Sequence, residues 1–146
     1  MKSDNRRFYM KAFLVLTIPV VLIQFIPYGR NHTNPPVIEE PRWDSQQCRG
    51  LVQRACYDCH SNETNWPWYS FVAPISWQVQ IDVEEGRQEV NFSEWNRPAQ
   101  DTRDLVRNVY INHMPPPDYQ FIHSSSRYTP EERQFVVTCF QKMFPQ

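Results

Sequence analysis

Glycine is scarce in this chain of 146 residues, which has only three: Gly29, Gly50 and Gly86. Neither a GxGxxG loop nor a GxxxxGK[ST] loop can be written with those positions, so glycine-rich nucleotide cradles are excluded. Most of the thirteen prolines lie outside any periodic segment, which disfavours a sheet-rich fold because strand interiors tolerate proline poorly. No convincing alternating strand and no internal repeat is found. The composition favours short helices joined by stiff loops.

Basic charge is also scarce outside the N-terminus. Residues 1–28 carry four Lys/Arg against one Asp, a sum of +3, whereas residues 29–146 carry 11 Lys/Arg against 15 Asp/Glu, a sum of −4. A mildly acidic body argues against nucleic-acid binding, which requires clustered Lys and Arg to neutralise phosphates. We therefore expect no nucleic-acid partner.

The first 28 residues have the pattern of an export signal. Basic residues precede a run from Ala12 to Tyr28 that is apolar apart from Thr17 and Gln24. As a helix this run would span about 25 Å, which is marginal for a membrane core of about 30 Å. Because no A-x-A cleavage site follows, we expect an uncleaved transmembrane anchor in the inner membrane, with the remainder in the periplasm. A cleaved signal peptide is the alternative.

The chain then divides into an anchor (1–28), a proline-rich tether (29–42) and a domain of residues 43–146. Apolar residues spaced three and four apart predict four helices in this domain. They are expected at 44–56, beginning at Asp44 or Ser45, and then at 74–89, at 101–112, and from Thr129 onward, where Thr129-Pro130-Glu131-Glu132 has the spacing of a capping box.

A C-x-x-C-H motif, formed by Cys56, Cys59 and His60, closes the first of these helices. Two thiols at this spacing can add to the two vinyl groups of one haem, and the histidine that follows then lies under the iron as its proximal ligand. The motif predicts one covalent haem c. Cys56 and Cys59 hold the porphyrin and His60 holds the iron.

Three other uses of the motif have to be weighed. A thioredoxin-like redox site would follow a strand and open a helix, whereas this motif closes one. A zinc site needs two further ligands at metal spacing, and the remaining cysteines and histidines form no second close pair. A structural disulfide between Cys56 and Cys59 is the third alternative.

Around the motif the chain resembles a known family. The segment CYDCHSNETNWPWYSFVAPISWQVQIDVEEGRQEVNFSEW and the later HMPPPDY are similar to the membrane-anchored bacterial haem-binding domain family, a divergent branch of the class I cytochrome c-like proteins. The resemblance covers about residues 43–146. It implies an all-α fold with cytochrome c-like helices around one covalent haem and an extracytoplasmic location, and it implies no known substrate.

The sixth iron ligand has to come from another part of the chain. Met114 follows an expected helix and precedes proline, which favours extended backbone, and class I cytochromes c present their distal methionine in a similar way. His113 is the adjacent competitor, and an open sixth position is the third possibility. We expect His123 and His32 to be solvated loop histidines and Met143 to belong to the core.

The aromatic residues Trp66, Trp68 and Tyr69 follow the motif closely. Two roles are open for them. Their rings can wall the haem, with an indole N–H or the Tyr69 hydroxyl bonded to a propionate, or they can form the core of a small domain. The two roles are compatible.

Cys48 and Cys139 lie on the apolar faces of the first and last expected helices. These helices cross in the cytochrome c-like fold, so the resemblance implies that the two faces meet, with Gly50 permitting close approach. A disulfide between the two cysteines and a pair of buried free thiols are both open.

The preferred hypothesis is a membrane-tethered monohaem c-type cytochrome that passes single electrons to an unknown redox partner protein and is not itself an enzyme. Filled axial positions would allow electron transfer without bond formation at iron. An open sixth position would instead fit a haem-based sensor, a small-ligand binder or a peroxidase-like enzyme. The identity of the sixth ligand separates these functions.

Overall fold

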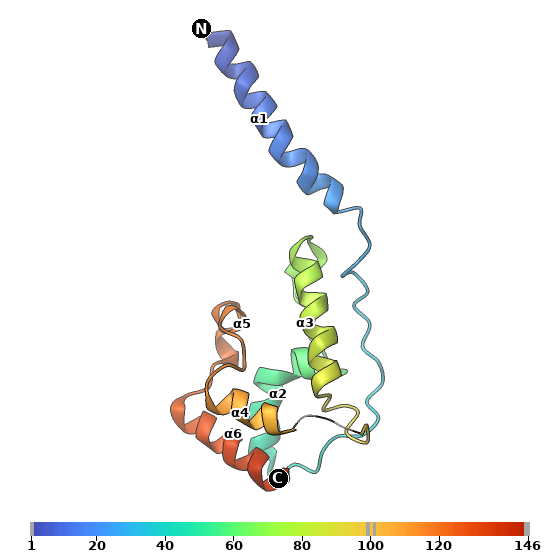
Figure 1. The fold of residues 1–146 in the computed structure, drawn as a ribbon, viewed down its shortest axis with the longest axis vertical. Coiled ribbons are helices and arrows are strands. Elements are labelled where there is room, and N and C mark those ends of the chain that lie inside the picture. Colours follow the sequence, from blue (N-terminus) through green and yellow to red (C-terminus); the bar gives the residue numbers. More distant parts are fainter. Residues whose placement is uncertain (1, 99, 101, 145–146) are drawn as a thin grey trace. The chain divides into compact units, whose positions relative to one another are not determined.

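The computed structural model describes residues 2–98, 100 and 102–144. In this part of the chain it contains helices and loops, with one isolated bridge between Glu39 and Glu94 and no strand, so the predicted all-α class is confirmed. Figure 1 labels the helices α1 (Lys2–Ile23), α2 (Gln46–His60), α3 (Ile75–Glu89), α4 (Thr102–Tyr110), α5 (Pro117–Ile122) and α6 (Pro130–Met143). Two 3-10 helices lie between them, η1 (Trp68–Phe71) and η2 (Ser124–Ser126).

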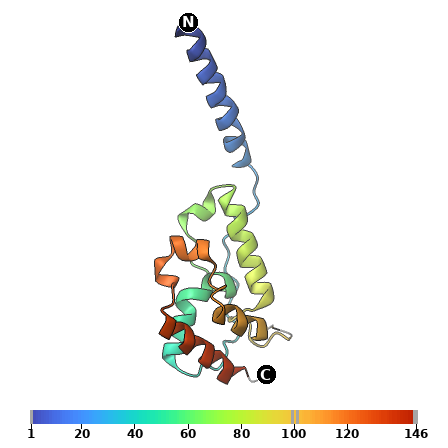
Figure 2. The same ribbon diagram turned by 60° about the vertical axis from the view of Figure 1, so that its left-hand side comes forward.

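Figure 2 shows the first helix, α1, as one continuous helix. It ends before the apolar run of the sequence does. It stops at Ile23, whereas the run continues to Tyr28. Pro27 lies just beyond and disfavours helical backbone in the residue before it. The helical part of the run, residues 12–23, is therefore only about 18 Å long.

This length overturns the prediction of a transmembrane anchor. Any 18 consecutive residues of α1 include Arg6, Arg7 and Lys11. No helix among the described residues is long and apolar enough to cross a membrane. The predicted N-terminal transmembrane helix is wrong, and so is the predicted single-pass location in the inner membrane with a periplasmic domain.

The chain divides into two compact units. The first comprises residues 1–32 and 66–81, with α1, η1 and the beginning of α3. Within it, the Gln24 side chain donates to the Ala73 carbonyl at 2.8 Å and accepts from the Ala73 N–H at 3.0 Å. Gly29 has a φ of +73°, and a Cβ there would lie 2.5 Å from the carbonyl oxygen of Ser76. Both conditions require glycine at this turn.

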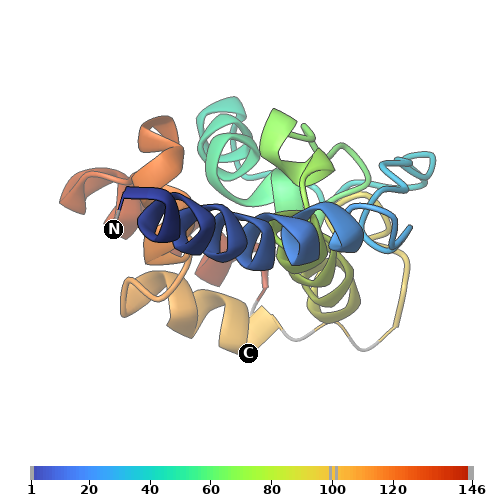
Figure 3. The same ribbon diagram turned by 90° about the horizontal axis from the view of Figure 1, so that it is seen from above.

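The second unit comprises residues 33–65 and 82–146. Within it, α6 packs against both α2 and α4 (Figure 1), and α5 packs against η2 in the segment drawn in orange (Figure 3). Phe92 and Phe140 are fully buried in the core and stack with their ring centroids 6.2 Å apart. The other large contributors are buried faces of the three packed helices: Leu51, Val52, Ala55 and Tyr57 of α2, Leu105, Val106 and Val109 of α4, and Val136 and Val137 of α6.

The helix starts predicted from capping signals are confirmed. The Ser45 hydroxyl accepts the Cys48 backbone N–H at 3.1 Å at the start of α2. At the start of α6, the Thr129 hydroxyl accepts the Glu132 N–H at 3.2 Å and the Glu132 carboxylate accepts the Thr129 N–H at 3.0 Å. Both helices thus begin with backbone donors satisfied by local side chains.

The helix ends differ more from the predictions. α2 continues past Cys56 to His60, where Ser61 ends it and donates its hydroxyl to the Tyr57 carbonyl at 2.8 Å. α4 ends at Tyr110, before the predicted end, while the predicted start at Asp101 lies outside the described residues. α5 was not predicted, although Pro117 at its first position and Asp118 in its first turn are helix-start signals.

A disulfide links Cys48 in α2 to Cys139 in α6, with their Cα atoms 6.4 Å apart and 91 residues between them in sequence. The disulfide alternative is therefore confirmed over the pair of free thiols. The role suggested for Gly50 is wrong, because a Cβ at that position would meet nothing within 4 Å. The disulfide, rather than a close backbone approach, fixes the crossing of these two helices.

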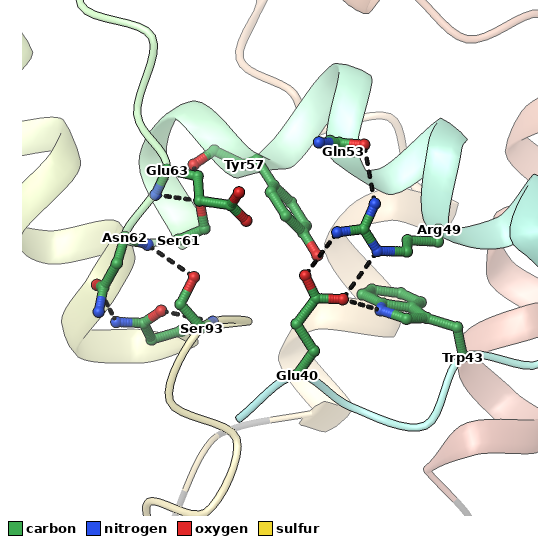
Figure 4. Close-up of polar contacts among 10 residues, drawn as sticks. Glu40, Trp43, Arg49, Gln53, Tyr57, Ser61, Asn62, Glu63 and Ser93 are labelled. Atoms are coloured by element: carbon green, nitrogen blue, oxygen red, sulfur yellow. Dashed lines mark hydrogen bonds and ion pairs between the residues drawn. The ribbon is translucent and has the colours of Figure 1, made fainter. Parts of the chain in front are cut away.

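A polar cluster joins Glu40 to α2 (Figure 4). The Glu40 carboxylate accepts two hydrogen bonds from the Arg49 guanidinium, at 2.6 and 2.8 Å, and one from the Trp43 indole N–H at 3.0 Å. The bonds from Arg49 hold the pKa of Glu40 below its usual value. The segment leading into α2 is thereby tied to the first turns of that helix.

Candidate functional site

The C-x-x-C-H motif forms the last turn of α2. Its two cysteines are both free thiols, so the alternative of a Cys56–Cys59 disulfide is not what the structure shows. The carbonyls of Tyr57, Asp58 and His60 and the Asp58 carboxylate all accept hydrogen bonds from residues after the helix, including the Thr64 hydroxyl, which donates to the Asp58 carbonyl at 2.8 Å. The end of the helix is therefore well ordered by its own surroundings.

Tyr128, next to the start of α6, lies beside the first thiol. Its hydroxyl donates to the Leu51 carbonyl at 3.0 Å and lies 3.7 Å from Cys56 Sγ. Since the hydroxyl proton is used on Leu51, the oxygen is left to accept from the thiol. Burial raises the pKa of the Cys56 thiol to about 11 and that of Cys59 to about 12. Both sulfurs are neutral thiols at neutral pH.

His60 is oriented by two backbone carbonyls of the α3 region. Its Nδ1 lies 2.8 Å from the Gly86 oxygen and 3.1 Å from the Val90 oxygen. A carbonyl can only accept, so Nδ1 carries the proton and Nε2 carries the lone pair. Burial lowers the pKa of His60, which favours the neutral ring. This tautomer, with one nitrogen tied to a carbonyl, is the usual state of a metal-ligating histidine.

Gly86 has a second role, because α3 approaches the motif very closely at this residue. A Cβ on Gly86 would lie 2.5 Å from the Cys59 carbonyl oxygen and 3.0 Å from Cys59 Cβ. Any side chain would force the helices apart and lengthen the bond from His60. The sequence signal for this role was only the presence of a glycine in the predicted helix, and it was not recognised.

The chain after His60 is held in a buried polar frame (Figure 4). The Phe92 N–H donates to the His60 carbonyl at 2.8 Å, and the Asn62 N–H donates to Ser93 Oγ at 2.9 Å. The Asn91 side chain donates to Asn62 Oδ1, also at 2.9 Å. Asn62, Asn91 and Ser93 are almost fully buried, so breaking these bonds would leave buried polar groups without partners. The frame keeps the histidine in register with α3.

Met114 and His113 lie on the loop between α4 and α5. Both backbone N–H groups donate to the Asn108 carbonyl, at 2.9 Å for His113 and 3.0 Å for Met114. Met114 is half-buried and packs against the core of the second unit, whereas His113 is exposed. Met143 also packs against that core, as predicted. The choice of Met114 as an iron ligand stays a prediction.

Trp66, Trp68 and Tyr69 belong to the first unit. Trp66 is half-buried and stacks on His32, with ring centroids 4.4 Å apart. Trp68 is 79% exposed and meets Tyr69 edge-on at 5.9 Å. Trp68 is thus not part of a packed core in this unit, and a role of the three rings toward haem stays a prediction.

Neither of the two histidines expected to be solvated is a free loop residue. His32 is enclosed by Trp66 and Phe71, and both of its ring nitrogens are buried. His123 is half-buried and stacks on Tyr119 at 4.4 Å. His32 was wrongly expected to be solvated because its aromatic neighbours, Trp66 and Phe71, are distant in sequence. The neighbour of His123 is Tyr119, one turn away on α5.

A zinc site of the kind weighed above finds no support in the structure. Within residues 2–98, 100 and 102–144, no group of three or more His, Cys, Asp and Glu side chains is placed to hold a metal ion. An imidazole oriented with its Nε2 free is instead suited to haem iron, which takes four nitrogen ligands from the porphyrin and its remaining ligands from the protein.

Comparison with known proteins agrees with this interpretation of the motif. The model of the family described as haem-binding domain matches residues 18–142. No curated protein and no solved structure matches the chain significantly. The matched region covers most of the sequence and contains the whole C-x-x-C-H motif as well as Met114. The chain therefore belongs to the haem-binding domain family, and its ligand is haem.

Proposed function

We propose that this protein is a monohaem c-type cytochrome that carries single electrons. Cys56 and Cys59 would hold one haem covalently, and His60 would bind its iron. The observation that carries the proposal is the pair of hydrogen bonds from His60 Nδ1–H to the carbonyls of Gly86 and Val90, directly after two free thiols. These bonds leave Nε2 available for iron.

The free thiols suit covalent attachment. Each thiol would add its S–H across one vinyl double bond of haem to give a thioether, with no atom lost. Bound haem supplies an iron couple that alternates between ferric and ferrous states. The carbonyls of Gly86 and Val90, which accept the His60 Nδ1–H, increase the basicity of the imidazole. A more basic ligand stabilises ferric iron and so lowers the reduction potential.

We assign the sixth position to Met114. The side chain is half-buried against the core, whereas the exposed His113 has no such packing. A thioether is soft and uncharged and favours ferrous iron, which raises the potential. With both axial positions filled, the protein would exchange electrons with a redox partner protein and bind no substrate at iron.

Optical spectra of the haem-loaded full chain test this assignment. Ferric protein is expected to show the weak far-red band of sulfur-to-iron charge transfer, and ferrous protein is expected not to bind carbon monoxide. Met114→Ala should abolish the band and open the iron to carbon monoxide, while the matched variant His113→Ala should change neither.

Two results would overturn electron transfer with methionine ligation. Loss of the low-spin spectrum in His113→Ala, but not in Met114→Ala, would make His113 the ligand. Carbon monoxide binding by the unmodified protein would show an open sixth position and favour a sensor or an enzyme.

A further inference from the structure

We propose that Tyr119 is a positioning residue for Met114: its hydroxyl, bound to Asp58, holds the methionine segment against the haem-attachment turn. This inference rests on the proposed function, because it concerns the residue assigned as sixth ligand. It goes beyond that function by naming a contact that sets how firmly Met114 is held.

The contact starts inside the C-x-x-C-H motif. Asp58 lies between the two cysteines on the last turn of α2. Its Oδ2 accepts the Tyr119 hydroxyl at 2.5 Å, and its Oδ1 accepts the backbone N–H of Asn65 at 3.0 Å. A hydroxyl bound to a carboxylate at this distance is a charge-assisted hydrogen bond, about twice as strong as a neutral one. Asp58 is fixed from both sides, so it is a firm anchor.

Tyr119 is itself held in place within its own segment. Its ring stacks on His123 with centroids 4.4 Å apart and an interplanar angle of 20°. The His123 N–H donates to the Tyr119 carbonyl at 2.8 Å, and the Arg127 side chain donates to the Gln120 carbonyl at 2.8 Å. The hydroxyl is therefore presented to Asp58 by a side chain with little rotational freedom.

α5 packs against η2 but buries little apolar surface of its own. None of its residues is buried, and Phe121 and Ile122 are 81% and 59% exposed. Because apolar burial provides most of the stability of a short helix in a protein, a helix without it depends on specific polar contacts. The bond from Tyr119 to Asp58 is such a contact, and it joins residues 61 positions apart.

Met114 lies in the sequence between two contacts, the bond to Asn108 before it and the bond from Tyr119 to Asp58 after it. Upstream, its backbone N–H donates to the Asn108 carbonyl in α4 at 3.0 Å. Downstream, the Gln120 side chain donates to the Pro115 carbonyl at 2.5 Å, which couples α5 to the residue after the methionine. Releasing Tyr119 would remove the direct bond between α5 and the haem-attachment turn, and Met114 would be held by the Asn108 bond and by its packing on the core. The methionine would then dissociate from iron more readily.

Imidazole competition measures this effect directly, because exogenous imidazole binds ferric iron only when the methionine has left. In the haem-loaded full chain, Tyr119→Phe should increase the affinity for imidazole about tenfold or more, since a hydrogen bond to a charged group is lost. The matched control is Tyr110→Phe, which removes a hydroxyl from a ring that is 65% exposed and should leave the affinity unchanged.

A double-mutant cycle assigns the effect to the contact. Asp58→Asn should also tighten imidazole binding, and the two changes together should do little more than either alone. If the wild type shows the far-red band and Tyr119→Phe binds imidazole as the wild type does, the inference is overturned and the proposed ligation stands. A loss of thermal stability without a change in imidazole affinity overturns it equally. If the wild type lacks the band, the methionine ligation fails and the inference fails with it.

Discussion

The two ends of α2 both carry cysteines, yet their chemistry differs completely. Near the N-terminal end, Cys48 is joined to Cys139 in a disulfide that ties α2 to α6. At the C-terminal end, Cys56 and Cys59 are free, and their neighbours are a tyrosine hydroxyl and the backbone of α3. The first end stabilises the fold, and the second is the end that we propose binds haem.

The difference lies in what the surrounding elements offer to each sulfur. Cys48 faces another cysteine at a Cα separation of 6.4 Å, which lies within the range that a disulfide can bridge. Cys56 faces Tyr128, and Cys59 faces Gly86, so neither has a thiol from another helix as its partner. Identical residues on one helix are thus assigned separate roles by the elements packed against them.

The largest expected effect comes from removing the disulfide. The double variant Cys48→Ala/Cys139→Ala should lower the free energy of unfolding by roughly 2–5 kcal/mol, because a long loop is no longer closed. The covalent haem content should not change if the two ends of α2 are independent. Guanidinium unfolding measures the first effect and the haem-to-protein ratio the second. A loss of haem in the double variant would contradict the independence of the two ends of α2.

A smaller effect is expected at Gly86, where α3 touches the motif. Gly86→Ala should cost roughly 1–3 kcal/mol of stability, because the new Cβ has to move away from Cys59. It should also raise the reduction potential, since the bond that makes His60 more basic is lengthened.

Gly50→Ala is the matched control, since a Cβ there has free space on the same helix as the motif. It should stabilise the protein by up to about 1 kcal/mol, as alanine is the better helix former. Equal effects of the two substitutions on potential and stability would contradict the role given to Gly86.

The smallest effect concerns Glu40, which ties the chain to the disulfide end of α2. Its folded pKa lies below the unfolded value, so its contribution is present above the unfolded pKa and is lost as the pH falls through the folded pKa. Glu40→Gln should therefore cost about 0.5–1 kcal/mol at neutral pH, a modest value because the pair with Arg49 is partly exposed. At a pH below the folded pKa, urea unfolding of the variant and the wild type should coincide. A deficit that is the same at both pH values would assign the loss to packing.

Local signals predicted the parts of this molecule that local contacts create. Ser45 and Thr129 start their helices through bonds that span three residues, and these starts were predicted correctly. The disulfide was predicted as one of two alternatives, because the resemblance indicated crossing helices. The C-x-x-C-H motif is also a local pattern, and the haem-binding role that it predicts for Cys56, Cys59 and His60 stays a prediction.

Features that depend on distant contacts could not be predicted in this way. His60 is oriented by carbonyls 26 and 30 residues away, and Asp58 is bound by Tyr119 from 61 residues away. No periodicity encodes these contacts, since a backbone carbonyl is present at every residue. The anchor was predicted wrongly for a related reason: the apolar run was read as one helix, whereas the helix within it ends at Ile23.

The central claim is that Cys56 and Cys59 bind haem covalently, and intact mass is its most direct test. The full chain, produced together with the machinery that attaches haem, should retain its colour through acid-acetone extraction and have the mass of the polypeptide plus one haem. Cys56→Ser/Cys59→Ser should have the mass of the polypeptide alone, while Cys48→Ala/Cys139→Ala should keep the added haem. A wild-type mass equal to that of the bare polypeptide, with the haem extracted into acetone, would contradict the account.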